Sequence, residues 1–296
     1  MKTIPLPKFF GVGAPKSGTT SLHDILIQHP QIFLPRVKET NFFLIDELYN
    51  KGIDFYKKTF FSEWNGEKVV GEINPSYMFD SRVIKRIYND VGKDVKLFFI
   101  FRNPVDRAYS HYWMNFRRGF EKKPFEDAIR KEKENCDFNS DEKLFCYLRK
   151  GLYSVYVKKY LEYFPKKNMF FIIFETDFLK EKKKTIENLL NFLGVDNFDL
   201  NLNVKSNPNR IYKSKFVREL VYGESFLRKI GKKLIPNVIM RKKIKKWADK
   251  LYTKPFTPPQ LDKELRKELL RQYFLEDIKE LESILNRDLS VWYGEI

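Results

Sequence analysis

The stretch from residue 8 to residue 21 constrains the fold of this chain more than any other. It reads as an apolar strand (8–12), a loop with the sequence G-A-P-K-S-G-T-T-S (13–21), and the start of a helix. Gly13 and Gly18 keep the glycine spacing of a nucleotide triphosphatase loop. However, Thr19 stands where that loop has its lysine, and the lysine lies at Lys16 instead. The pattern predicts a phosphate loop with altered chemistry.

Backbone amides from Gly18 onward would lie at the positive end of the helix dipole, where they bind a 5′-phosphate. Hydroxyl donors flank these amides. They come from Ser17, Thr19, Thr20 and Ser21. This loop is the first predicted anion site.

Short apolar runs alternate with amphipathic segments along the chain. The runs at 8–12, 68–71, 95–101 and 169–174 read as strands, and the run at 95–101 is apolar enough to be buried on both sides. Strands alternating with helices predict an α/β fold of the phosphate-loop type, a parallel sheet with helices on both faces. From about residue 215 the pattern is helical to the end. No repeat or low-complexity linker divides the chain, so we expect one domain over residues 1–296.

A second anion site is predicted where the buried strand ends. The strand runs into R-N-P-V-D-R-A-Y-S-H-Y (102–112), so Arg102 lies at the carboxyl edge of the sheet, where ligands bind in open α/β folds. Pro104 suits the first turn of a helix, which places Ser110 about one and a half turns in. Arg102 and Ser110 can then converge on a second phosphate. A triphosphatase has a metal-binding Asp at such a strand end, and this chain does not, so no metal site is predicted.

Amino-acid composition limits the possible binding partners only partly. Lys and Arg number 56 and Asp and Glu 39, which gives a net charge of +17 and favours an anionic partner. The basic, amphipathic segment 225–256 reads as a solvated helix face, with contact to a membrane surface or cover over an acceptor left open. No apolar run of about 18 residues and no signal core occur, which indicates a soluble, cytoplasmic protein. Cys136 and Cys146 are expected to be unpaired thiols.

Together the two anion motifs resemble those of the sulfotransferases that use 3′-phosphoadenosine-5′-phosphosulfate (PAPS). The likeness to this family, and to its heparan-type and bacterial carbohydrate members, extends over most of the chain and is weakest near 205–260. The matching segments are P-K-S-G-T-T (15–20), P-R-V-K-E-T-N-F-F (35–43), G-E-I-N-P-S-Y (71–77), R-N-P-V-D-R-A-Y-S-H-Y (102–112), G-L-Y (151–153), Y-F-P (163–165) and R-D-L-S-V-W (287–292).

The resemblance implies a role for each matching residue. Lys16 contacts the transferring sulfuryl group and the bridging oxygen, and Arg102 and Ser110 hold the 3′-phosphate. Glu39, in the segment similar to K-E-x-x-F-F, is the base that deprotonates the acceptor hydroxyl. The donor is then PAPS, the product is adenosine 3′,5′-bisphosphate, and no metal is needed because a lysine and backbone amides stabilise the developing charge.

The acceptor is less well defined. A carbohydrate hydroxyl or amine is favoured, but heparan-type members commonly have lysine at the position of Ile73 and histidine at that of Asn41, so a lipid, sterol or other small alcohol stays open. A phosphate-loop kinase and a basic nucleic-acid-binding protein are more remote alternatives; no nucleic-acid partner is expected, and the oligomeric state is undetermined. His23 and His111 fall in predicted helices and are expected to make packing or polar contacts.

Overall fold

The computed structural model describes residues 3–135, 145–204, 210–222 and 251–294. These residues form two compact units. The first comprises residues 1–107, 148–206 and 263–296, and the second comprises residues 108–147 and 207–262. The expectation of a single domain stays a prediction.

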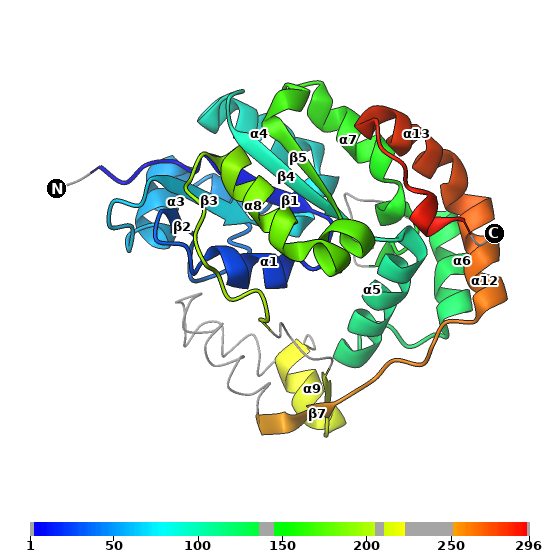
Figure 1. Ribbon diagram of the computed structural model, residues 1–296. Helices are drawn as coiled ribbons and strands as arrows, with labels where there is room; N and C mark the ends of the chain where they lie inside the picture. Colours follow the sequence, from blue (N-terminus) through cyan, green and yellow to red (C-terminus); the bar gives the residue numbers. More distant parts are fainter. Residues whose placement is uncertain (1–2, 136–144, 205–209, 223–250, 295–296) are drawn as a thin grey trace. The chain divides into compact units, whose positions relative to one another are not determined.

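A five-stranded sheet forms the centre of the first unit (Figure 1). Its strands lie in the order β2-β3-β1-β4-β5, and every neighbouring pair is parallel. The strands are β1 (Phe9–Gly13), β2 (Ile32–Phe33), β3 (Val69–Ile73), β4 (Lys96–Phe101) and β5 (Met169–Ile173). The four predicted strands are confirmed, and β2, only two residues long, was too short to give a pattern.

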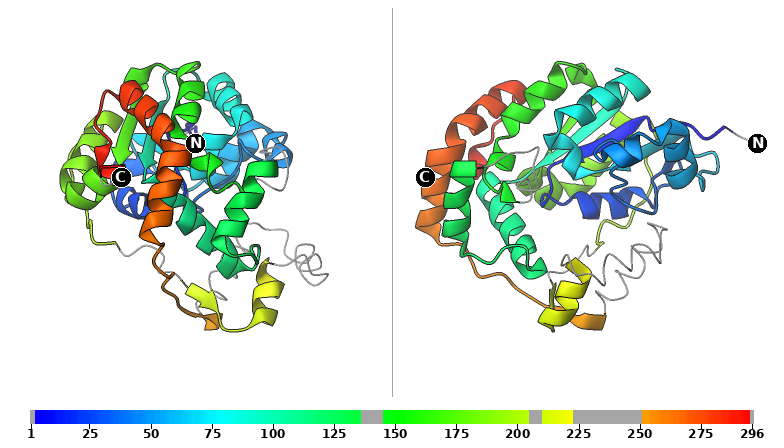
Figure 2. Two further views of the ribbon diagram at one scale, coloured as in Figure 1. Left: turned by 90° about the vertical axis from the view of Figure 1, so that its right-hand side faces the viewer. Right: turned by 180° about the vertical axis from the view of Figure 1, so that it is seen from behind.

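Helices cover both faces of this sheet, as predicted (Figures 1 and 2). On one face Phe98 and Ile100 pack in a core with α1 (Thr19–Leu26) and α8 (Lys182–Leu193). On the other face Phe99 meets Tyr160 and Phe101 stacks on Tyr153, both from α7 (Tyr153–Leu161). Alternate residues of β4 therefore point to opposite faces, which explains why its sequence is apolar throughout.

The rest of the first unit is mainly helical. Trp292 near its end is buried and accepts a hydrogen bond at its carbonyl from Asn103 Nδ2 (3.1 Å). The remaining elements are α2 (Asp46–Tyr49), α3 (Gly52–Phe60), η1 (Pro75–Phe79), α4 (Ser81–Val91), η3 (Arg149–Gly151), η4 (Lys166–Asn168), η5 (Phe174–Lys180), α12 (Lys263–Leu269), η6 (Leu270–Phe274), α13 (Leu275–Leu285) and η7 (Ser290–Trp292).

The second unit departs from the prediction of helix alone after residue 215. Here β6 (Arg210–Tyr212) pairs antiparallel with β7 (Thr253–Pro255), and the Arg210 side chain donates to Thr253 Oγ1 at 2.6 Å. A three-residue strand is too short to show an alternating pattern. The described helices are α6 (Phe125–Asn135) and α9 (Lys215–Tyr222), with α5 (Pro104–Arg118) beginning in the first unit.

Two further expectations concern this part of the chain. Cys146 is disulfide-bonded, so the expectation of unpaired thiols is wrong; the other cysteine, Cys136, lies outside the described residues. Most of the basic segment 225–256 also lies outside them. Among the helices that the structure describes, none combines the length and apolar character needed to span a membrane.

Gly71 of β3 faces the aromatic ring of its cross-strand neighbour. A Cβ atom at this position would lie 2.2 Å from Phe9 Cζ, well inside van der Waals contact. We expect Gly71→Ala to lower the free energy of unfolding by about 1–3 kcal/mol, because Phe9 would have to leave its place in the core. Urea denaturation measures this loss.

Lys68→Ala, at an exposed position before the same strand, is the control and should change the unfolding free energy by less than about 0.5 kcal/mol. Equal effects of the two substitutions would show that the ring over Gly71 does not determine strand packing.

Candidate functional site

The loop between β1 and α1 has the backbone form of an anion site. Gly18 is the N-cap residue of α1 and lies in the left-handed region (φ 95°); having no side chain, it makes no cap hydrogen bond to the first turn. A Cβ atom at Gly18 would lie 3.0 Å from the Phe174 ring, so both the φ angle and the close ring favour glycine. Ser17 is fully buried, and among the described residues its Oγ has no hydrogen-bond partner. The uncapped amides are therefore available to an anion at the positive end of the helix.

Arg102 lies against this loop. It follows β4, and its Nη1 donates to the carbonyl of Lys16 at 3.2 Å while its guanidinium lies 5.4 Å from the centre of the Phe174 ring. The Tyr153 hydroxyl donates to the Arg102 carbonyl at 2.8 Å. The structure thus brings Arg102 and the loop together. Ser110 belongs to the second unit, so its predicted convergence with Arg102 stays a prediction.

Glu175 anchors the chain just after Arg102. Its carboxylate accepts from the backbone amide of Asn103 (2.9 Å) and from Trp292 Nε1 (2.8 Å). The Asn103 side chain in turn accepts a hydrogen bond from the amide of Val105 and so caps the start of α5. These three hydrogen bonds hold the junction between β4 and α5, where Arg102 lies. The sequence did not point to Glu175, because its partners lie far away along the chain.

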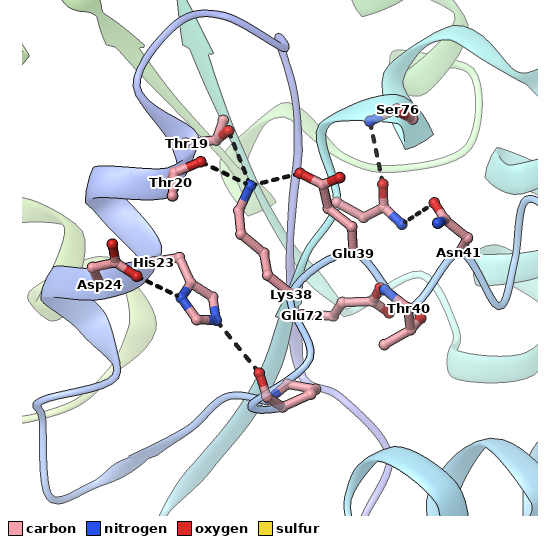
Figure 3. Close-up of polar contacts among 12 residues, drawn as sticks. Thr19, Thr20, His23, Asp24, Lys38, Glu39, Thr40, Asn41, Glu72 and Ser76 are labelled. Atoms are coloured by element: carbon pink, nitrogen blue, oxygen red, sulfur yellow. Dashed lines mark hydrogen bonds and ion pairs between the residues drawn. The ribbon is translucent and has the colours of Figure 1, made fainter. Parts of the chain in front are cut away.

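A second loop, residues 34–41, follows β2 and carries Glu39 (Figure 3). Lys38 Nζ donates to Glu39 Oε1 at 2.7 Å and lies 3.5 Å from Thr19 Oγ1 and 3.4 Å from Thr20 Oγ1. Lys38 therefore joins this loop to the first turn of α1. The resemblance gave Glu39 the role of base but assigned Lys38 no role.

Glu72 holds the second loop in place from β3. Its buried carboxylate accepts from the Thr40 amide (3.0 Å), the Thr40 hydroxyl (2.7 Å) and the Tyr56 hydroxyl (2.6 Å). Glu39 and Asn41, on either side of Thr40, both have positive φ angles of 61° and 59°. Such a backbone costs energy for residues other than glycine, so the hydrogen bonds to Glu72 offset that cost.

Burial raises the pKa of Glu72, and the hydrogen bonds it accepts from Tyr56, Thr40 and Tyr77 act in the opposite direction. Desolvation is the larger effect because the carboxylate is completely enclosed. Glu72 was visible in the sequence only as part of G-E-I-N-P-S-Y, with no role attached.

The structure describes both positions at which the sequence departs from heparan-type members. Ile73 is buried at the end of β3, with 1% of its surface exposed. Asn41 Oδ1 accepts from Nδ2 of the fully buried Asn74 at 3.0 Å. Neither residue presents a cation at this edge of the sheet.

His23 and His111 make the packing or polar contacts predicted for them. His23 Nε2 lies 3.4 Å from the Pro35 carbonyl, which connects α1 to the start of the second loop. Burial lowers the pKa of His23, with a smaller contribution from the nearby Lys38 ammonium. His111 packs edge-on against the Tyr147 ring in the second unit.

Taken together, the first unit has cationic side chains, an uncapped helix N-terminus and a carboxylate at one edge of its sheet. The cations Lys38 and Arg102 contact the loop residues, and Glu39 contacts Lys38. Such an arrangement can bind a multiply charged anion and can accept a proton beside it.

Comparisons with known proteins agree with this chemistry. The model of the sulfotransferase domain family matches residues 6–254. Human heparan sulfate glucosamine 3-O-sulfotransferase 5 is 32% identical over 165 residues, which are 54% of this chain and 45% of that protein. The membrane-associated sulfotransferase kil1 of Dictyostelium discoideum is 35% identical over 113 residues, 38% of this chain and 23% of that protein.

Among solved structures, a sulfotransferase from Alicyclobacillus acidocaldarius superimposes with a TM-score of 0.69 at 29% identity, covering 98% of this chain and 99% of that one. The chain spans less than half the length of the two curated relatives above.

The buried Glu72 should make stability depend on pH. Because its pKa is raised in the folded state, the folded protein binds this proton more tightly than the unfolded chain, and stability falls as pH rises from about 4.5 through the raised pKa. Glu72→Gln cannot lose a proton. We therefore expect the unfolding free energy of the variant, relative to wild type, to increase with pH across this range, as measured by urea denaturation at several pH values.

Glu276→Gln, at an exposed position of α13, should leave the pH profile unchanged. A Glu72→Gln profile parallel to that of wild type would mean that Glu72 does not titrate in this window.

Proposed function

The chain belongs to the sulfotransferase domain family, and on that premise we propose that it transfers a sulfuryl group from PAPS to a hydroxyl or amine of an acceptor, with a carbohydrate favoured. The observation that carries the proposal is the contact between Arg102 and the glycine loop, with Glu39 joined to the same helix end through Lys38. Two basic groups and a proton acceptor are what this reaction requires.

The residues at the sheet edge fit the donor. The uncapped first turn of α1 and the left-handed Gly18 suit its 5′-phosphosulfate. We assign this group to Lys16, Ser17, Gly18, Thr19, Thr20 and Ser21. Arg102 is assigned to the 3′-phosphate because a guanidinium forms paired hydrogen bonds with phosphate oxygens. Ser110 is assigned to the same phosphate from its sequence motif alone.

When bound, PAPS supplies an activated sulfuryl group on its 5′-phosphate. Transfer forms a bond between the acceptor oxygen and sulfur and breaks the bond between sulfur and the bridging oxygen, with the electron pair leaving on adenosine 3′,5′-bisphosphate. Lys16 stabilises the charge that develops on the bridging oxygen. Glu39 accepts the proton that the acceptor hydroxyl loses. No metal enters this scheme, and metal independence stays a prediction.

The acceptor class rests on the relatives. The human relative is named for glucosamine of heparan sulfate, which supports a glycan acceptor here. Ile73 and Asn41 supply no cation at this edge of the sheet, which favours a less densely charged glycan. A cytoplasmic location and a membrane contact through 225–256 stay predictions from the sequence.

Glu39→Gln tests the function and the base together. It keeps the size of the side chain but removes its ability to take a proton, so we expect turnover to fall by at least about 10²-fold without weaker binding of adenosine 3′,5′-bisphosphate. Transfer of labelled sulfate from PAPS to panels of glycans, lipids and phenols measures turnover, and calorimetry measures binding.

Wild-type protein that transferred no label to any class of acceptor would contradict the proposed function. Glu39→Gln with near-normal turnover would leave the function in place but remove Glu39 from the role of base.

A further inference from the structure

Lys38 contacts both parts of the proposed site, the first turn of α1 and the carboxylate of Glu39. Its ammonium donates to Glu39 at 2.7 Å and lies within 3.5 Å of the Thr19 and Thr20 hydroxyls in the first turn of α1. Only 16% of the Lys38 side chain is exposed, against 43% for Glu39. The ammonium is therefore held between the loop proposed to bind the donor and the carboxylate proposed to act as base.

This position creates two competing demands on one cation. An anion at the N-terminus of α1 would lie beside the hydroxyls that Lys38 already contacts, and phosphate oxygens carry more charge than a single carboxylate. The Glu39 carboxylate competes for the same ammonium. When one of these two anions contacts the Lys38 ammonium, the contact between Lys38 and the other anion becomes weaker.

The pairing also bears on catalysis. An ammonium in direct contact stabilises the charged form of a carboxylate, which makes that carboxylate a weaker proton acceptor. In the contact seen here, Glu39 is therefore less suited to deprotonate an alcohol than it would be with Lys38 turned away.

We propose that Lys38 exchanges partners when the donor binds, leaving Glu39 for the 5′-phosphosulfate at the first turn of α1. This inference rests on the proposed function, since it takes the donor site and the base from it. Donor binding then strengthens the base, because it draws the ammonium away from the Glu39 carboxylate. The acceptor proton goes to Glu39.

The surrounding structure permits the exchange without moving the base. Thr40 is fixed to Glu72 by two hydrogen bonds, and Asn41 is fixed to Asn74. The backbone of Glu39 is thus anchored by the residues that follow it. Lys38 has a long, flexible side chain whose head can change partners by side-chain rotation alone.

A double-mutant cycle on the binding of adenosine 3′,5′-bisphosphate tests the exchange without an acceptor. Glu39→Gln removes the competing carboxylate, so we expect affinity to rise by about fivefold or more. Lys38→Gln removes the cation, so affinity should fall by about tenfold or more. In the double variant the gain from Glu39→Gln should disappear, because it acts through Lys38. Calorimetry at constant pH and salt gives all four affinities.

Lys158→Gln is the matched control, because Lys158 pairs with Glu280 elsewhere in the first unit, and it should leave bisphosphate affinity unchanged. If Glu39→Gln still raised bisphosphate affinity in the Lys38→Gln background, the gain would come from removing a negative charge near the site and not from releasing Lys38. That result would overturn the exchange. Unchanged affinity in Lys38→Gln would overturn it as well.

If Lys38→Gln does not fold, the Glu39→Gln variant alone tests the exchange. Unchanged or weaker bisphosphate binding in Glu39→Gln would contradict competition for Lys38. The outcome also separates the two proposals. Wild-type protein that transfers sulfate but fails the cycle refutes only the exchange, whereas wild-type protein that binds no bisphosphate refutes the proposed function and the exchange with it.

Discussion

The parallel pairing of β1 with β3 on one side and β4 on the other is the constraint on which the site depends. All three strands end at the same edge of the sheet. The residues after β1 form the glycine loop, those after β4 begin with Arg102, and those after β3 begin with Asn74. Close approach of these strands requires Gly71 under Phe9 and Gly11 under Phe98, so the packing of two aromatic rings and the position of the site are linked.

A buried carboxylate adds the second requirement. The loop that carries Glu39 has two residues with positive φ, and Glu72 offsets this strain through hydrogen bonds to Thr40. Burying a carboxylate is itself costly unless donors surround it, and Tyr56 and Tyr77 complete the set. The position of the proposed base Glu39 therefore depends on Glu72 of β3 as well as on its own loop.

The sequence predicted the parts of this architecture that local pattern encodes. The four longer strands, the helices on both faces and the glycine loop followed from apolar periodicity and spacing. The predictions failed where the pattern was short or the partner distant. β2 and β7 have two and three residues, the disulfide at Cys146 could not be inferred from two cysteines, and the contacts of Glu72, Glu175 and Lys38 join segments that only the tertiary fold brings together.

The central claim is that one edge of the sheet holds both phosphates of an adenosine nucleotide, with Arg102 reserved for the 3′-phosphate. The most direct measurement is calorimetry of adenosine 3′,5′-bisphosphate and of adenosine 5′-monophosphate with wild-type protein and Arg102→Ala. Wild type should prefer the bisphosphate by about 2–5 kcal/mol, and Arg102→Ala should lose most of this preference. Equal losses of affinity for the two nucleotides would contradict the account, because Arg102 would then support the loop without binding the 3′-phosphate.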